Sequence, residues 1–421
     1  MDYSKFINPH ASQRNPSLIR EMTQMLATAE PGTIFMAGGF PNPEMFPFES
    51  VDVRVDANIQ VHLEGSALSA ALQYQPTLGY PPLRDELKRL IYRDHKPPKF
   101  DDMDGLVTIG SQHGLSGIFG VILQNGDPVV VPQPVYSSAL AIMDPYRPVY
   151  LAVPEDSLGM QPALLKSILD KWSSSNSHEQ LPKILYVNPT GTNPTGAVIP
   201  TERKREIYQI AEEYDLLIIE DDPYYYLHFE EDDPVSFLSM DTSCRVIRLE
   251  SFSKVFSSGI RVGFAFGPKP IIRQLELLTQ HTVLHCSSLS QVIVHRILEQ
   301  WGPAGFTEHT KKVKAFYRNR RNLMVSAAEK HLTGLAVWDV PRGGMFLWMK
   351  VLGLKDTYQM LMQRGIKQGI MLLPGKEFMP DRSITYPYVR ASYSVASHDD
   401  IDKGEVISAR TALSSYIYSL V

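Results

Sequence analysis

The sequence predicts an α/β protein with a mainly parallel β-sheet flanked by helices, together with a smaller α+β unit. Two observations predict this fold class. From about residue 106 to residue 266, short runs that are apolar throughout alternate with amphipathic helical segments. Strands of that composition are buried on both faces, as in a parallel sheet covered by helices. After about residue 306 the composition changes, and a long helix rich in Lys and Arg begins.

The elements are predicted in the following order. Apolar runs predict strands over Leu106–Ile109, Pro128–Val131, Ile184–Val187, Leu216–Ile219, Arg245–Leu249 and Val262–Phe266. Apolar residues at helical spacing predict helices from near Ser111, over Gln161–Trp172 and from Pro200. The polar stretch Ser173–Glu179 is predicted to be a loop. In the smaller unit we expect a helix over Thr307–His331 and strands over Val337–Val340 and Gly344–Met349.

These elements suggest three parts of the chain. We expect an N-terminal arm over residues 1–48 that packs with the small domain. A large, cofactor-binding domain is expected over residues 49–306, and a small C-terminal domain over residues 307–421. A chain of 421 residues is long enough for two to four domains.

Composition limits the kinds of partner and compartment. A net charge of −5 gives no reason to expect nucleic acid, and no run approaches the ~18 apolar residues of a membrane helix. Cys244 and Cys286 form neither a disulfide framework nor a metal cluster, so we expect free thiols and no metal. The segment up to Arg20 has basic residues but no apolar signal core. We therefore expect an intracellular protein, in the mitochondrial matrix or the cytoplasm.

The clearest chemical signal is a lysine that follows a predicted buried strand. Lys254 is bracketed by Ser251 and Ser253, and Arg261 follows seven residues later. Ligands of open α/β sheets lie beyond the carboxyl ends of the strands. A lysine amine can form a Schiff base with an aldehyde cofactor, and the two hydroxyls and the arginine suit its phosphate. A polar loop with a solvated lysine is the plainer alternative.

Two further strand ends carry polar groups. Asp221 ends an apolar run, and its carboxylate can pair with a protonated pyridine nitrogen. Tyr224 and Asn193 can each donate to a phenolic oxygen of the same cofactor, and Asn193 lies in a stiff loop of Pro and Gly residues. Taken singly, each stretch also reads as an ordinary turn.

A fourth strand end opens a helix. Ser111 and Gln112 would present backbone N–H groups at the helix N-terminus, which is an anion site. His113 is more simply a structural histidine on the first helical turn. The joint occurrence of four complementary strand-end loops predicts a site for pyridoxal 5'-phosphate.

The chain resembles the class I/II aminotransferases of fold type I over nearly its whole length, and most closely their kynurenine/2-aminoadipate branch. The resemblance rests on stretches that include Arg14–Arg20, Ala37–Pro43, Glu220–Tyr225, Asp241–Arg261 and Gly344–Trp348. The seven-residue interval from Lys254 to Arg261 is similar to that branch and to the aminotransferase-like halves of some bacterial regulators. We expect no DNA-binding domain before this chain, which disfavours a regulator. The resemblance implies a seven-stranded sheet.

The resemblance also implies roles for five further residues. Tyr136 would stack on the pyridine ring, and Tyr74 would reach the phosphate of the neighbouring subunit, which implies a homodimer with shared active sites. Arg390 would grip the substrate α-carboxylate beside Gly39 and Asn193. Arg20 would meet a side-chain carboxylate. The implied reaction is ping-pong transamination from L-kynurenine, L-2-aminoadipate and related amino acids to 2-oxoglutarate, with Lys254, Asp221 and Tyr224 as catalytic residues.

Departures from the branch leave substrate preference open. Phe40 stands where we expect leucine, and His113 stands where we expect glutamine. A broad aromatic or branched-chain aminotransferase and a cofactor-dependent β-lyase remain alternatives, and a ligand-sensing module without catalysis is a third.

Overall fold

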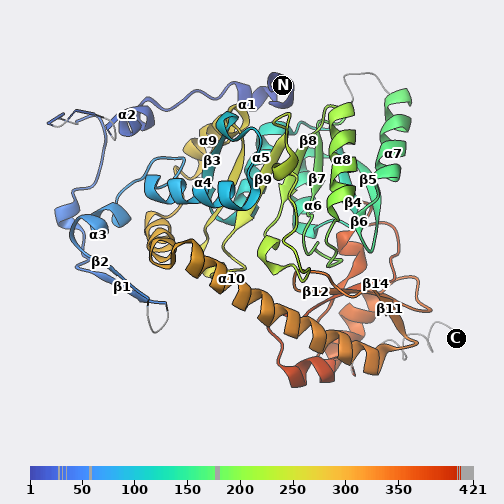
Figure 1. Ribbon diagram of the computed structural model, residues 1–421. Coiled ribbons are helices and arrows are strands. Elements are labelled where there is room, and N and C mark those ends of the chain that lie inside the picture. The colour runs from blue at the N-terminus through green and yellow to red at the C-terminus, as the bar shows by residue number, and fades with distance from the viewer. Residues whose placement is uncertain are drawn as a thin grey trace. The chain divides into compact units, whose positions relative to one another are not determined.

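The computed structural model describes residues 1–26, 29–30, 32–34, 36–55, 59–175, 181–404, 406 and 408 (Figure 1). The chain divides into two compact units. Unit 1 comprises residues 1–124, 217–223 and 237–309, and unit 2 comprises residues 125–216, 224–236 and 310–421. The predicted domain boundaries, and the predicted packing of the arm with the small domain, stay predictions. No helix in the described ranges is long and apolar enough to cross a membrane.

Unit 1 contains four sheet strands in the order β3-β10-β9-β8. Their bounds are β3 Met103–Thr108, β8 Leu217–Asp221, β9 Val246–Ser251 and β10 Gly263–Pro268. Strands β8 and β9 are parallel, whereas β10 runs antiparallel to both β9 and β3. All four were predicted as buried apolar runs, and their residues are almost all buried.

The remaining elements of unit 1 surround these strands. They are η1 Ser4–Phe6, α1 Pro9–Ser12, α2 Leu18–Leu26, η2 Pro43–Met45, β1 Val51–Arg54, β2 Gln60–Leu63, α3 Gly65–Leu72, α4 Pro81–His95, η3 Phe100–Asp102, α5 Gly110–Ile122, η7 Leu238–Met240, η8 Ser258–Ile260, α9 Lys269–Thr282 and the first part of α10. Helices α5 and α9 pack on the strands and on each other (Figure 1). Glycine permits the close approach of α5, because a Cβ at Gly114 would lie 2.7 Å from a methyl carbon of Leu249.

Unit 2 contains a second set of strands in the order β7-β4-β5-β6. Their bounds are β4 Pro128–Gln133, β5 Val149–Asp156, β6 Gly159–Met160 and β7 Ile184–Val187. Strand β4 is parallel to β5 and β7, and the two-residue β6 is antiparallel to β5. The resemblance implied seven strands, but these two sets contain eight in the described residues, because the two-residue β6 joins seven strands of at least four residues.

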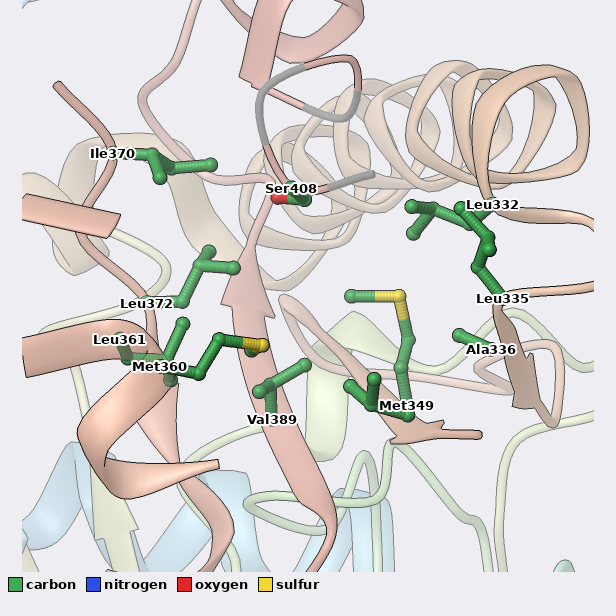
Figure 2. A pocket seen from close by; sticks show the side chains of 11 residues that line it. Leu332, Leu335, Ala336, Met349, Met360, Leu361, Ile370, Leu372, Val389 and Ser408 are labelled. Atoms are coloured by element: carbon green, nitrogen blue, oxygen red, sulfur yellow. The ribbon is translucent and has the colours of Figure 1, made fainter. Parts of the chain in front are cut away.

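Helices and a second sheet complete the described part of unit 2. They are α6 Ser137–Met143, η4 Asp144–Tyr146, α7 Pro162–Ser175, α8 Thr201–Glu213, η6 Tyr225–Leu227, β11 Ala336–Trp338, β12 Phe346–Val351, η9 Met360–Gly365, η10 Ile366–Gln368, β13 Leu373–Pro374, η11 Gly375–Phe378 and β14 Tyr388–Ser392. The second sheet is antiparallel in the order β11-β12-β14-β13. A cavity of about 20 Å³ lies beside this sheet. Figure 2 shows the side chains that line it, which are apolar apart from Ser408.

Several predicted boundaries were wrong. Strand β12 spans Phe346–Val351 rather than Gly344–Met349, since a bend at Gly344 and Met345 precedes it. Ser173–Ser175 belong to α7 rather than to a loop, since the amphipathic helix continues to Ser175, and residues 176–179 lie outside the described residues. Strand β11 ends at Trp338, before the turn that leads into Pro341. Helix α10 spans Ser288–Leu332 with an interruption at Gly302, where φ is 56° and ψ is −177°. The predicted helix from Thr307 is the part after that interruption.

Candidate active site

Lys254 lies on the turn that follows β9 in unit 1, and its side chain is half-buried. Two aromatic residues anchor the turn. The rings of Phe252 and Phe256 stack with centroids 5.0 Å apart, and both side chains pack inward. His309 Nε2 donates to the carbonyl oxygen of Val255 at 2.6 Å. The apolar residues on either side of Lys254 therefore fix the backbone that presents the amine.

Arg261 lies at the N-terminus of α5. Its Nη2 donates to the carbonyl oxygen of Ile109 at 2.9 Å, and its Nη1 contacts Ser253 Oγ at 3.3 Å. Gly110 begins α5 with φ of +70°, and a Cβ there would lie 2.6 Å from Arg261 Nη2. Only glycine lets the guanidinium lie this close to the first N–H groups of the helix.

This corner of unit 1 combines two sources of positive potential. Ser111 and Gln112 occupy the first turn of α5, whose N–H groups have no partner within the helix. Ser251 Oγ accepts from the Ser253 N–H at 3.2 Å and so shapes the turn before Lys254. The arginine and the helix N-terminus together suit a phosphate group.

His113 takes the structural role that the sequence favoured. Its Nδ1 accepts from the Ile109 N–H at 3.3 Å, so the ring caps the N-terminus of α5 by binding the residue that precedes the helix. Burial lowers the pKa of His113 below its ordinary value. The ring is therefore neutral at neutral pH.

Asp221 ends β8 and is 4% exposed. It pairs in register with Leu249 of β9, which faces Gly114 of α5. Asp221 therefore lies on the face of the strands that α5 covers. Its neighbours Glu220 and Asp222 point to the opposite face, because side chains alternate along a strand.

That opposite face contains a buried ionic network around Arg248. Arg248 is fully buried, and its guanidinium lies 3.1 Å from Glu220, 3.0 Å from Asp222 and 2.6 Å from Glu250. Glu220 also accepts from the N–H groups that begin η7. His95 of α4 lies 3.4 Å from Glu250. Burial raises the pKa of Glu250 to about 7, while Arg248 opposes that rise.

The N-terminal residues of the predicted site also lie in unit 1. Arg20 is buried, and its guanidinium donates to the Gln75 carbonyl oxygen and, at 3.3 Å, to Thr77 Oγ1. Tyr74 is 45% exposed and meets His285 edge-on with ring centroids 5.9 Å apart. A Cβ at Gly39 would touch nothing within 4 Å, so its backbone is open to a ligand.

Unit 2 brings the other predicted residues together around Arg390 of β14. Arg390 Nη1 donates to Asn193 Oδ1 at 2.8 Å, and the guanidinium lies 4.1 Å from the centroid of the Phe346 ring. Tyr224 is 5% exposed and meets Phe346 edge-on at 6.1 Å. Burial lowers the pKa of Arg390, and the hydroxyls of Tyr224 and Tyr136 act in the other direction. Arg390 Nε is buried and has no hydrogen-bond partner among the described residues.

A side-chain hydrogen bond and a close backbone contact fix the loop that carries Asn193. Asn188 Oδ1 accepts from the Asn193 N–H at 2.7 Å. Gly191 and Gly344 touch, since a Cβ at Gly344 would lie 2.6 Å from the Gly191 carbonyl oxygen. This contact brings the loop against the start of β12.

Sequence reasoning missed Arg248, Phe346 and Asn188. Arg248 had a signal, because a charged residue interrupts an otherwise apolar strand. The role of Phe346 had none, since only folding places its ring against Arg390.

The fold and these two groups of residues define the class of protein, an aminotransferase. The chain belongs to the aminotransferase class I and II family, whose model matches residues 46–403. It is 42% identical over 411 residues to the kynurenine/alpha-aminoadipate aminotransferase, mitochondrial, of Bos taurus. The match covers 96% of this chain and 97% of the bovine protein. An aromatic amino acid aminotransferase of Dictyostelium discoideum is 32% identical and covers 96% of this chain and 86% of its own.

A solved structure shares the fold. The kynurenine aminotransferase of Pyrococcus horikoshii, in complex with PMP, KYN as substrates and KYA as products, superposes with a TM-score of 0.78. Its sequence is 30% identical, and the match covers 98% of each chain. The predicted α/β aminotransferase fold is confirmed.

Proposed function

We propose that the protein transfers the amino group of L-kynurenine, L-2-aminoadipate and related amino acids to 2-oxoglutarate. One observation carries the proposal. In the described part of the chain, Arg20, Arg261 and Arg390 bond to carbonyl, amide and hydroxyl oxygens and form no ion pair with a carboxylate. Three buried or anchored positive charges are thus left for anions, and the reaction needs three: a phosphate, an α-carboxylate and a side-chain carboxylate.

The cofactor is pyridoxal 5'-phosphate. When bound, it supplies an aldehyde for the amino group and a ring that accepts electrons from the substrate Cα. The residues fit it. Arg261, Ser253 and the N–H groups of Ser111 and Gln112 would hold the phosphate, with Tyr74 of the neighbouring subunit and Ser251 beside them.

Lys254 is the proposed covalent anchor and proton carrier. Its Nζ would remove the Cα proton of the donor and return a proton to the cofactor carbon, acting as base and then as acid. The Asp221 carboxylate would hold the proton on the ring nitrogen, and its burial strengthens that interaction. Tyr224 and Asn193 would donate to the phenolic oxygen, and Tyr136 would stack on the ring.

Arg390 is proposed to bind the substrate α-carboxylate as a charge-assisted pair, with Nε supplying the N–H that now lacks a partner. Gly39 would add a backbone contact, and Asn193 would orient the guanidinium through the bond that it already accepts. Arg20 would meet a side-chain carboxylate, since the hydrogen bonds described for it use Nε and Nη2 and leave Nη1.

We further propose a homodimer with shared sites, in which Tyr74 reaches the partner's phosphate. Large apolar side chains of the N-terminal segment support an apolar interface, because they are strongly exposed: Leu18 68%, Ile19 58%, Met36 90%, Met45 79% and Phe48 55%. We also propose a mitochondrial location, supported by the name of the bovine relative. Light scattering and cell fractionation test these two points.

Broad specificity for aromatic donors is the second candidate. The ring centroids of Phe40 and Tyr74 lie 6.3 Å apart. Phe40 follows Gly39 in the sequence, and Tyr74 interacts electrostatically with Arg20. Two aromatic rings beside these proposed substrate residues favour an aromatic donor side chain. The Dictyostelium relative carries an aromatic name. A β-lyase is a weaker alternative, and it would turn over without a keto acid.

A donor panel with purified protein tests the proposal. Steady-state rates are measured for kynurenine, 2-aminoadipate, tyrosine, leucine and methionine, with and without 2-oxoglutarate. We expect kynurenine and 2-aminoadipate to be among the better donors and turnover to require the keto acid. Tyrosine alone as a good donor would favour the aromatic candidate, and turnover without keto acid would favour the lyase.

A further inference from the structure

Unit 2 contains a polar cavity of about 120 Å³ that no residue of the predicted active site lines. Its walls come from four places: the ends of β4 and β5, the loop after Asn193, the segment between β11 and β12, and strands β12 and β14 with the segment before β14. The lining residues are Gln133, Pro134, Glu155, Asp156, Ser157, Thr195, Gly196, Ala197, Asp339, Val340, Trp348, Tyr386 and Tyr388. The cavity is thus a separate feature that needs its own explanation.

One wall of the cavity is aromatic. The rings of Trp348 and Tyr388 stack at 5.2 Å with an interplanar angle of 18°, and those of Tyr388 and Tyr386 stack at 4.6 Å with an angle of 21°. Phe378 meets Trp348 edge-on and supports the stack from behind. Aromatic surface of this kind attracts cations and apolar groups.

The lining also includes three acidic residues, Glu155, Asp156 and Asp339. Asp156 is neutralised by Arg203, which reaches both of its carboxylate oxygens. The Glu155 carboxylate accepts a hydrogen bond from Thr195 Oγ1 at 3.5 Å. Neither Glu155 nor Asp339 forms an ion pair with a lysine or arginine in the described ranges of the chain. The cavity is therefore lined by two carboxyl groups, those of Glu155 and Asp339, that form no ion pair with a lysine or arginine among the described residues.

Glu155 shows the electrostatic cost of that arrangement. Burial of the carboxyl raises the pKa of Glu155 to about 8, and the nearby Asp156 adds to the rise while Arg203 and Thr195 oppose it. Burial, together with Tyr388 and Glu155, raises the pKa of Tyr386 to about 12. A proton thus occupies Glu155 at neutral pH, in the place that a cation would take.

We propose that this cavity binds a small organic cation, with an ammonium or guanidinium group on Glu155 and an apolar body against the Trp348–Tyr388–Tyr386 wall. The volume equals that of about four water molecules at ~30 Å³ each, which limits the cation to a few heavy atoms. The site adjoins Arg390, since Trp348 pairs in register with Arg390 and Tyr388 lies two residues before it on the same face of the sheet. The proposal is independent of the transamination, which needs anions at the three arginines.

The plainer occupant is water alone, since a polar cavity of this size is readily hydrated. Water and a cation differ in two measurable respects. A cation requires the ionised form of Glu155, and it gains from an apolar body, whereas water requires neither. Binding should therefore strengthen as the pH rises through about 8, the folded-state pKa of Glu155.

The experiment titrates n-propylammonium chloride into the full-chain holoenzyme by calorimetry, at pH 7 and pH 9 in buffers without amines. We expect saturable binding that is about tenfold tighter at pH 9, because one pH unit below the pKa leaves about a tenth of the carboxyl ionised. Propan-1-ol is the matched neutral probe and should not bind measurably. Holoenzyme reduced with borohydride, in which the cofactor can no longer condense with an amine, should bind propylammonium like the untreated protein, which places the site outside the predicted active centre.

Glu155→Gln should lose binding at both pH values. Glu213→Gln is the control, since Glu213 is an exposed carboxylate of the same unit paired with Lys166. If Glu155→Gln does not fold, Tyr388→Leu serves instead and should weaken binding severalfold. The proposal is overturned if no saturable binding occurs at pH 9, if propan-1-ol binds as tightly, or if borohydride reduction of the holoenzyme abolishes binding. None of these results bears on the donor panel.

Discussion

The buried Arg248 and the half-buried Arg390 show how differently one side chain is used in the two units. Arg248 of unit 1 is 0% exposed and faces three carboxylates at 2.6–3.1 Å. Arg390 of unit 2 faces one amide oxygen and the Phe346 ring, and its buried Nε has no hydrogen-bond partner among the described residues. The charge of Arg248 is neutralised by carboxylates of the same unit. The charge of Arg390 is not paired with a carboxylate among the described residues and can bind an anionic ligand.

The difference gives a physical criterion for a functional arginine. A buried guanidinium without a carboxylate is costly, so it persists where a ligand anion completes it. Arg20 meets the same criterion, because it is buried and bonds only to neutral oxygens in the described chain. Arg261 also bonds only to neutral oxygens there, but it is exposed. Variants of the two kinds of arginine should therefore fail in different ways.

The largest expected effect is on stability, from Arg248→Met. Removing the guanidinium leaves Glu220, Asp222 and Glu250 buried without a countercharge, and breaking such a pair costs about 3–5 kcal/mol. Urea unfolding at pH 7.5 measures the loss. Arg89→Met is the control, since Arg89 pairs with Glu86 at the surface and should cost under about 1 kcal/mol. Equal stability of the two variants would show that the network is not a structural element.

The second effect is on catalysis, from Arg390→Lys. Lysine keeps the charge but loses the planar fork that binds a carboxylate bidentately. We expect kcat/KM to fall about 100-fold for every donor, which is about 2.7 kcal/mol, with little change in Tm. Arg342→Lys is the matched control in the same unit, because Arg342 already binds Glu230 through two hydrogen bonds of 2.8 Å. A loss of kcat/KM confined to one donor class would show that Arg390 does not bind the α-carboxylate, which all donors share.

A smaller and selective effect is expected from Arg20→Gln. The half-reaction with 2-aminoadipate should slow about tenfold, since one charged hydrogen bond to the side-chain carboxylate is worth about 1.5 kcal/mol. The half-reaction with leucine should change less than about twofold. Single-turnover absorbance separates the two donors without using 2-oxoglutarate as acceptor. An equal loss for both donors would mean that Arg20 only supports the fold through Gln75 and Thr77.

The smallest effect concerns the apolar cavity of Figure 2, where no charge is involved. Ala336→Val should fill part of it and raise stability by about 0.5–1 kcal/mol, because β-branched residues also suit a strand. Ala391→Val is the control: Ala391 is 1% exposed in the same sheet and does not line the cavity. Overpacking there should cost about 1–3 kcal/mol. A gain from both substitutions would show that the sheet is loosely packed throughout.

The sequence predicted the strands of the large sheets best, because burial on both faces makes them uniformly apolar. Strand β14 was missed, since its burial alternates and its residues Tyr388–Ser392 show no apolar run. The half-buried β5 was missed for the same reason. The Lys254 and Arg261 spacing indicated a phosphate site, but only folding brings Arg261 to Ile109 and Gly110. The Glu155 cavity had no sequence signal, because its walls come from segments that are far apart in the sequence, from Gln133 to Tyr388.

The most direct test of the whole account is to identify the lysine that carries the cofactor. The purified protein is reduced with borohydride, which fixes the cofactor to its lysine, and the digested peptides are read by mass spectrometry. We predict the added mass on Lys254 alone, and a Lys254→Ala protein with neither the added mass nor transamination. A cofactor mass on any other lysine, or full activity of Lys254→Ala, would contradict the account.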